Sequence, residues 1–151
     1  MSSTPARDHS LPVTFRPTRT RVILLTTGVA MFAVVTFVGL TLDRLSPGER
    51  MSFVFTALIL FAVPALLARP KVVADDTGVT VVNITGVRRL EWAEIVRVNL
   101  RQGDPWVFLD LSDGTSHPVL GIQPGVAREA AVHDARALRA LVESHSSAAA
   151  A

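Results

Sequence analysis

Two long stretches without a charged residue dominate the hydrophobic pattern of the first half of the chain. Residues 22–42 form an uncharged run of 21 residues, and residues 51–68 form one of 18. At about 1.5 Å of helical rise per residue these runs extend for about 31 Å and about 27 Å, close to the bilayer hydrocarbon thickness of about 30 Å. Because lipid offers no partners to backbone polar groups, both runs are predicted to be transmembrane helices, forming a hairpin over residues 22–68.

Charged residues around these helices predict the orientation of the hairpin. The short turn at residues 43–50 holds two arginines, whereas six basic residues flank the hairpin on its other side. They are Arg7 and the membrane-flanking Arg16, Arg19, Arg21, Arg69 and Lys71. Since basic residues are retained on the cytoplasmic side, we expect a cell-membrane protein with two spans and both termini in the cytoplasm. Residues 1–21 are then a basic cytoplasmic tail.

A cleavable signal peptide is the alternative interpretation of the first run, which follows basic residues near the N-terminus. Its apolar run is longer than the usual length of about 7–15 residues, and no A-x-A-like cleavage site follows it. Neither run contains an ionisable residue or a GxxxG motif, the usual signs of a transport pathway or a helix–helix dimer. The pattern therefore favours a permanent anchor.

Beyond the second run the pattern changes to short apolar segments separated by turn residues. Asp113-Gly114 suits a type I′ turn and predicts a hairpin between its two neighbouring segments. Six strands are expected, at residues 72–74, 79–83, 87–91, 95–101, 106–111 and 116–120. Short strands at this spacing indicate an antiparallel sandwich or barrel.

The last segment has helical periodicity. Within residues 126–143 the apolar positions follow the three-to-four spacing of an amphipathic helix, at Ala127, Ala131, Ala135, Leu138 and Val142. We therefore expect a membrane α-hairpin followed by a small all-β or α+β domain at residues 71–145, in which the C-terminal helix closes the barrel or sandwich. Residues 146–151 are predicted to be a disordered tail.

The distribution of charge argues against a nucleic-acid partner. A formal charge of +2 and a pI of about 10.4 are typical of nucleic-acid-binding proteins. The basic surplus, however, lies next to the hydrophobic runs. Residues 71–151 hold eight basic and ten acidic residues, a net charge of −2. The chain has no cysteine, which excludes disulfides and thiolate chemistry.

Several short motifs in the second half are similar to those of a known family. They are Asp76-x-Gly78-Val79, Arg88-Arg89-x-x-Trp92-x-Glu94-Ile95 and Trp106…Leu109-x-Leu111…Asp113-Gly114. With two spans ahead of them, they resemble the bacterial pleckstrin-homology (PH) family, in particular the actinobacterial group named after low molecular weight protein antigen 6. The resemblance implies a PH-like barrel at a membrane and no catalytic residue. It also implies a seventh strand, expected near residues 72–74 or within residues 92–101.

Three residues are candidates for binding. Arg88 and Arg89 are suited to anions, because guanidinium forks match phosphate groups. Adjacent strand residues point to opposite faces, however, and nearby Glu91 and Glu94 favour ordinary salt-bridged arginines. Trp106 begins a strand, where an exposed indole would contact a partner or lipid headgroups.

No arrangement of residues in the sequence indicates catalysis or cofactor binding. The four histidines are widely spaced, and the chain lacks a G-x-S-x-G elbow and a glycine-rich phosphate loop. We therefore expect no enzyme activity, no metal and no cofactor. The predicted function is a membrane-anchored module for protein–protein interaction or scaffolding, whose partners are membrane lipids and another membrane or membrane-associated protein. The alternative is a sensor of anionic lipid headgroups.

Overall fold

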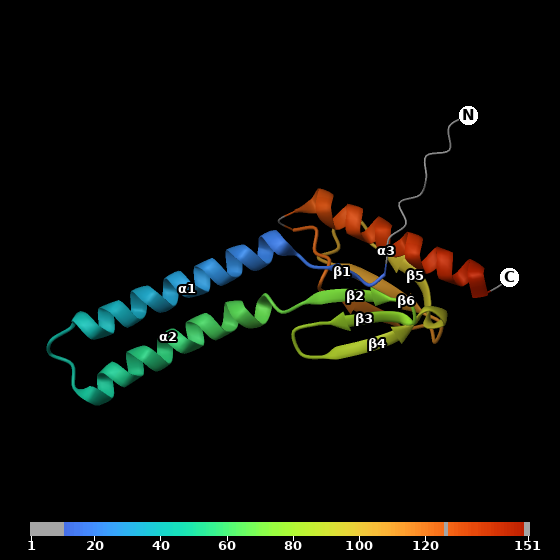
Figure 1. Ribbon diagram of the computed structural model, residues 1–151. Helices are drawn as coiled ribbons and strands as arrows, with labels where there is room; N and C mark the ends of the chain where they lie inside the picture. Colours follow the sequence, from blue (N-terminus) through green and yellow to red (C-terminus); the bar gives the residue numbers. More distant parts are fainter. Residues whose placement is uncertain (1–10, 126, 150–151) are drawn as a thin grey trace. The chain divides into compact units, whose positions relative to one another are not determined.

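The computed structural model describes residues 11–125 and 127–149 of the chain (Figure 1). It divides into two compact units: residues 18–69 form a helical hairpin, and the segments before and after it form a second unit. The hairpin is thus inserted between two parts of the same domain.

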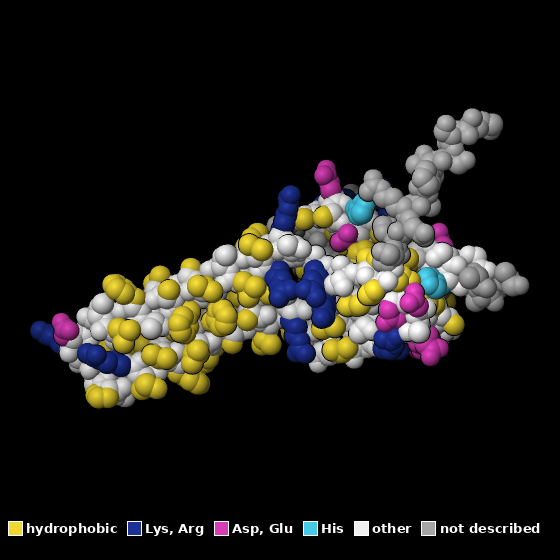
Figure 2. Space-filling model, viewed as in Figure 1, with side chains coloured by type: hydrophobic (Ala, Val, Ile, Leu, Met, Phe, Trp, Pro, Cys, Tyr) yellow, Lys and Arg dark blue, Asp and Glu magenta, His cyan; other side chains and the backbone are white. Residues whose placement is uncertain are grey.

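The hairpin consists of α1, Thr18–Thr41, and α2, Pro47–Leu67, both long and apolar enough to cross a membrane. Figure 2 shows hydrophobic side chains covering both helices and charged side chains at the turn between them. Phe37, for example, is 67% exposed. Such a surface is typical of helices in apolar surroundings, so the hairpin supports membrane association.

Both helices begin about one turn before the uncharged runs. At α2, Ser46 and Glu49 form a capping box, in which the Ser46 N–H donates to Glu49 Oε2 at 2.8 Å and the Glu49 N–H donates to Ser46 Oγ at 3.4 Å. Pro47 occupies the first helical turn, where its missing N–H is tolerated. Each uncharged run therefore begins one turn inside its helix and finishes within one residue of the helix end.

Two glycines of α1 allow the helices to approach closely. A Cβ atom placed on Gly39 would lie 2.5 Å from Phe53 Cβ, and one on Gly28 would lie 3.3 Å from Phe61 and Pro64. Small residues at a helix interface increase van der Waals contact, the main attraction between helices in lipid. Pro64, within α2, thus lies at the helix–helix contact.

The second unit contains two antiparallel sheets, with strand orders β1-β2-β3-β4 and β5-β6-β7. The strands are β1 Val13–Phe15, β2 Lys71–Asp75, β3 Gly78–Val82, β4 Val87–Glu91, β5 Ile95–Asn99, β6 Val107–Leu111 and β7 Ser116–Val119. A 3-10 turn, η1 (Trp92–Glu94), leads from the first sheet to the second, and α3 (Arg128–Ala149) follows. The predicted fold class is confirmed in its sandwich form. The described strands do not close into a barrel.

The strand β1 lies within residues 1–21, which the sequence led us to describe only as a basic cytoplasmic tail, and it supplies the seventh strand. It pairs with β2, with Val13 opposite Ala74 and Phe15 opposite Val72. Its three residues are too few to show alternation, and its partner lies beyond the whole hairpin. The sequence therefore gave no local signal, and the extra strand is not at either expected position. Residues 1–10 of the tail lie outside the described residues.

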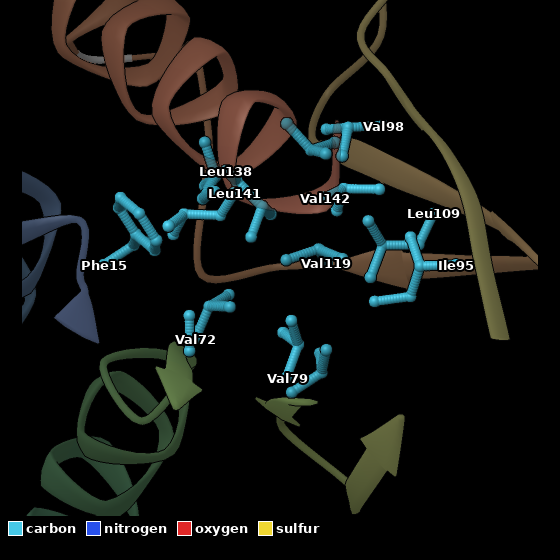
Figure 3. Packing of buried hydrophobic residues seen from close by; sticks show 14 of the residues in the cluster. Phe15, Val72, Val79, Ile95, Val98, Leu109, Val119, Leu138, Leu141 and Val142 are labelled. Atoms are coloured by element: carbon cyan, nitrogen blue, oxygen red, sulfur yellow. The ribbon is translucent and has the colours of Figure 1, made fainter. Parts of the chain in front are cut away.

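Apolar side chains fill the space between the sheets and α3 (Figure 3). Alternating strand residues point inward; Val79 and Val81 of β3 are fully buried, for instance. The helix contributes Ala131, Ala135, Leu138, Leu141 and Val142 to the cluster. Two of these five residues, Ala131 and Ala135, are small and lie in the first half of the helix. Phe15 of β1 also lies in this core.

An asparagine joins the two sheets on one side of the sandwich. Asn83 Nδ2 donates to the Pro118 carbonyl at 2.9 Å, and the Leu120 N–H donates to Asn83 Oδ1 at 3.1 Å. The turn after β3 is thereby fixed to the outer edge of β7. Pro118, which has no N–H, is suited to such an edge.

The helix α3 extends to Ala149, past residue 145, where the sequence led us to end the domain. The His145 ring stacks on Trp92, with ring centroids 4.2 Å apart, and Trp92 Nε1 donates to the Asp75 carbonyl at 3.0 Å. This contact holds the last turns of the helix against η1. Residues 146–149 are therefore helical rather than disordered, and residues 150–151 lie outside the described residues.

Candidate functional site

Arg89 is held by neighbouring side chains on the outer face of the first sheet. Its Nη2 lies 3.0 Å from both carboxylate oxygens of Asp75 and also donates to the Thr77 hydroxyl. Its Nη1 donates to Thr80 Oγ1 at 3.2 Å. Arg89 therefore forms a salt bridge, but with Asp75 rather than with Glu91 or Glu94.

Arg88 lies on the opposite face of β4, the face it shares with buried Leu90. Burial and the nearby charge of Arg88 lower the pKa of His117. Arg88 also lowers the pKa of Asp113, after the larger effect of hydrogen bonds from Thr115. Arg88 is therefore at the rim of the sandwich near the β6–β7 hairpin, and the two arginines do not converge on one site.

Trp106 is half-buried rather than fully exposed. Its ring centroid lies 6.4 Å from that of Phe108, which is paired across the sheet with Pro118. The indole N–H is buried and has no hydrogen-bond partner among the described residues. These three side chains form a small apolar patch on the outer face of the second sheet.

The neighbours of Asp75 stabilise the charged form of its carboxyl group. The hydroxyl and backbone N–H of Thr77 donate to Oδ1 at 2.7 and 2.9 Å, and Arg89 adds its charge. Together they lower the pKa of Asp75 from 3.8 to about 2. Charged Asp75 therefore stabilises the folded domain fully above pH 3.8, and this contribution is lost as the pH falls toward about 2.

We expect the Asp75→Asn domain to lose less stability than the wild-type domain as the pH falls through this acidic range. Urea midpoints at several pH values can be followed by tryptophan fluorescence, because both tryptophans, Trp92 and Trp106, lie in the β domain. Asp76→Asn, at an exposed neighbour, is the matched control and should behave like the wild type. Equal pH dependence of the wild type and Asp75→Asn would contradict this role for Asp75.

Two cavities beside α3 were not predicted from the sequence. One, of about 440 Å³, lies between the loop after β5 and the first turns of α3, and the other, of about 400 Å³, lies between β5 and a later part of α3. We call them together the β5–α3 groove; its charged lining residues are Arg97, Arg101, Asp104, Arg128, Arg139 and Glu143. The arginines come from two distant segments, so their proximity requires the tertiary fold. The only sequence signal was their spacing, four residues apart on one segment and eleven on the other.

The membrane-flanking residues lie in different parts of the fold. Arg19 and Arg21 are in the first turns of α1, and Arg69 follows α2. Arg16 lies between β1 and α1, whereas Lys71 begins β2 and so belongs to the β domain. Among the described residues, no group of three His, Asp or Glu side chains is arranged to hold a metal ion.

Comparison with known proteins agrees with this architecture. Three uncharacterized mycobacterial proteins are 33% identical to the chain over 85 residues: Rv1417 and MT1460 of Mycobacterium tuberculosis strains H37Rv and CDC 1551, and Mb1452 of Mycobacterium bovis. The match covers 56% of this chain and 54% of each relative, so the chain spans about half the length of these proteins. No solved structure gives a significant match.

The sequence model of one family matches residues 69–141, and that family is described as the bacterial PH domain. The matched segment includes β2 to β7 and most of α3 but not β1. The resemblance to bacterial PH domains is thereby confirmed as a match of that family's model to residues 69–141 of this chain.

Proposed function

We propose that this chain is a non-enzymatic, membrane-anchored PH module that binds a protein partner at the cytoplasmic face of the cell membrane. A PH domain joined to two helices able to cross a membrane is a membrane-associated module. The observation that carries the choice of a protein partner is the separation of Arg88 and Arg89. Arg89 is paired with Asp75, and Arg88 lies on the other face of β4. A phosphate-binding pocket built on these two arginines is therefore not assembled.

The pairing of β1 with β2 supports the proposed topology. One strand precedes the hairpin and the other follows it, yet both belong to one sheet. They must lie on the same side of a membrane, which requires an even number of crossings. Two spans satisfy that condition, and the excess of basic flanking residues favours the cytoplasm for the β domain.

Anchoring also favours a role in protein interaction. Confinement next to a membrane raises the effective concentration of the domain toward other membrane-bound proteins, so that weak contacts suffice. Val87 and Val96 are 59% and 65% exposed and are the large apolar side chains most accessible in the described part of the β domain. Together with Trp106, they mark surfaces at which a partner gains apolar contact.

Site-directed photocrosslinking in living cells tests the proposed function. With a photoreactive residue at position 87, 96 or 106 of the full chain, we expect discrete protein adducts at one or more positions. Thr14, which is exposed on β1, is the control position and should give none. Lipid adducts alone at all three positions would refute the protein-partner proposal and favour the headgroup sensor.

A further inference from the structure

We propose that the β5–α3 groove binds an extended acidic segment of the protein partner. This inference rests on the proposed function and names the chemistry of the partner. Its evidence is the geometry of the groove, its charge, and the way its arginines are distributed.

The groove lies along an edge strand. β5 is the terminal strand of its sheet, and α3 lies beside it (Figure 1). Arg139 Nη2 donates to the Val98 carbonyl at 2.8 Å and so links the helix to the outer edge of this strand. The side chains of Val98 and Val142 are buried at the floor, whereas Val96 is exposed at the rim. A bound segment would therefore meet apolar contacts as well as charges.

The groove is positive although the domain is negative. Four arginines and two acidic residues line the groove, a net charge of +2, whereas residues 71–151 carry −2. The groove thus concentrates half of the eight basic residues of that segment. Such separation of charge favours an acidic ligand and speeds its encounter.

Three of these arginines are available for a ligand. The ion pairs within the described residues are Arg89–Asp75 and His133–Asp134, so Arg97, Arg101 and Arg128 are in none. Asp104, the acidic residue near Arg101 and Arg128, already accepts a hydrogen bond from the Arg101 backbone N–H at 2.8 Å. Unpaired guanidinium groups bind carboxylates with two parallel hydrogen bonds.

The arginines are spread along the groove rather than gathered at one point. Arg101 lies four positions after Arg97, about 13 Å along extended chain. Arg139 lies eleven positions after Arg128, about 17 Å along the helix. A single carboxylate or phosphate cannot reach both ends. An extended segment of about five residues spans this length. A flat bilayer surface would not reach the buried floor of the groove.

Peptide binding to the full chain in nanodiscs of neutral phosphatidylcholine tests this proposal. The probes are fluorescein-labelled peptides of six alternating residues, Glu/Val in one and Lys/Val in the other, followed by fluorescence polarisation. We expect binding of the Glu/Val peptide, weakened by added salt and reduced about ten-fold or more by Arg101→Gln/Arg128→Gln. The Lys/Val peptide should not bind.

The control variant is Arg44→Gln/Arg136→Gln, which removes the same charge at two exposed positions outside the groove. It should bind like the wild type. Equal binding by both double variants, or no binding by the wild type, would overturn the proposal. Hydrogen exchange of the β5 amides gives a further test. Protection of these amides only in nanodiscs with anionic lipid would also overturn the proposal. If protein adducts still form from positions 87 or 106, the proposed function stands and only the groove assignment falls.

Discussion

Replacing Phe15 with alanine is expected to destabilise the β domain by about 3–5 kcal/mol, the usual effect of truncating a buried phenylalanine. Phe15 is 6% exposed and lies in the core cluster with Val72, its partner across the sheet. Truncation would leave a cavity and remove the buried side chain that holds β1. A loss of this size is a large part of the stability of a small domain.

Urea unfolding of the full chain in mild detergent, followed by tryptophan fluorescence, measures this effect. Both tryptophans lie in the β domain, so the signal does not report on the helices. Thr14→Ala alters the exposed neighbour on the same strand and should shift the midpoint little. A midpoint of Phe15→Ala equal to that of the wild type would show that β1 is not part of the folded domain.

Placing an arginine at Val34 is expected to prevent membrane insertion of α1. Val34 lies near the middle of the helix and is 62% exposed on the hairpin surface. A charge at the centre of a span costs about 2.5–3.5 kcal/mol on scales from insertion experiments. With α1 outside the bilayer, the turn between the helices would no longer be translocated.

The cysteine-free chain makes this outcome easy to measure. In the Asp43→Cys background a membrane-impermeant maleimide should label intact cells, whereas Thr85→Cys in the β domain should stay unlabelled. Adding Val34→Arg should abolish labelling at position 43, and adding Val34→Leu should leave it unchanged. Strong labelling of Thr85→Cys in intact cells would reverse the proposed topology.

The sequence predicted those parts of the fold whose physical cause is local. Uncharged runs identified the hairpin, because exclusion from water acts on every residue of a span. Alternation and the Asp113-Gly114 pair identified the strands of the β domain after the hairpin, and three-to-four spacing identified α3. The predicted type I′ turn is wrong, because Gly114 has a positive φ and Asp113 does not. The family resemblance rested on the same local motifs.

The parts that were missed depend on contacts between distant residues. β1 is a strand because β2 lies beside it, and the end of α3 is ordered because His145 reaches Trp92. The two sheets are connected by the η1 corner and by Asn83, neither of which has a distinctive sequence pattern. At the candidate site, adjacency of Arg88 and Arg89 predicted opposite faces, but not that Asp75 would hold one of them.

The interruption of one sheet by two helices has a consequence for the order of events on the ribosome. β1 is synthesised first, and the partner of its Phe15 follows 57 positions later, after both helices have been made. The sheet therefore cannot be completed during synthesis of its first strand, although domains generally fold as their N-terminal parts emerge. If one helix fails to cross, β1 and β2 end on opposite faces of the bilayer and the core lacks Phe15. Completion of the sheet thus excludes chains in which one helix alone has crossed, because their β1 and β2 cannot pair.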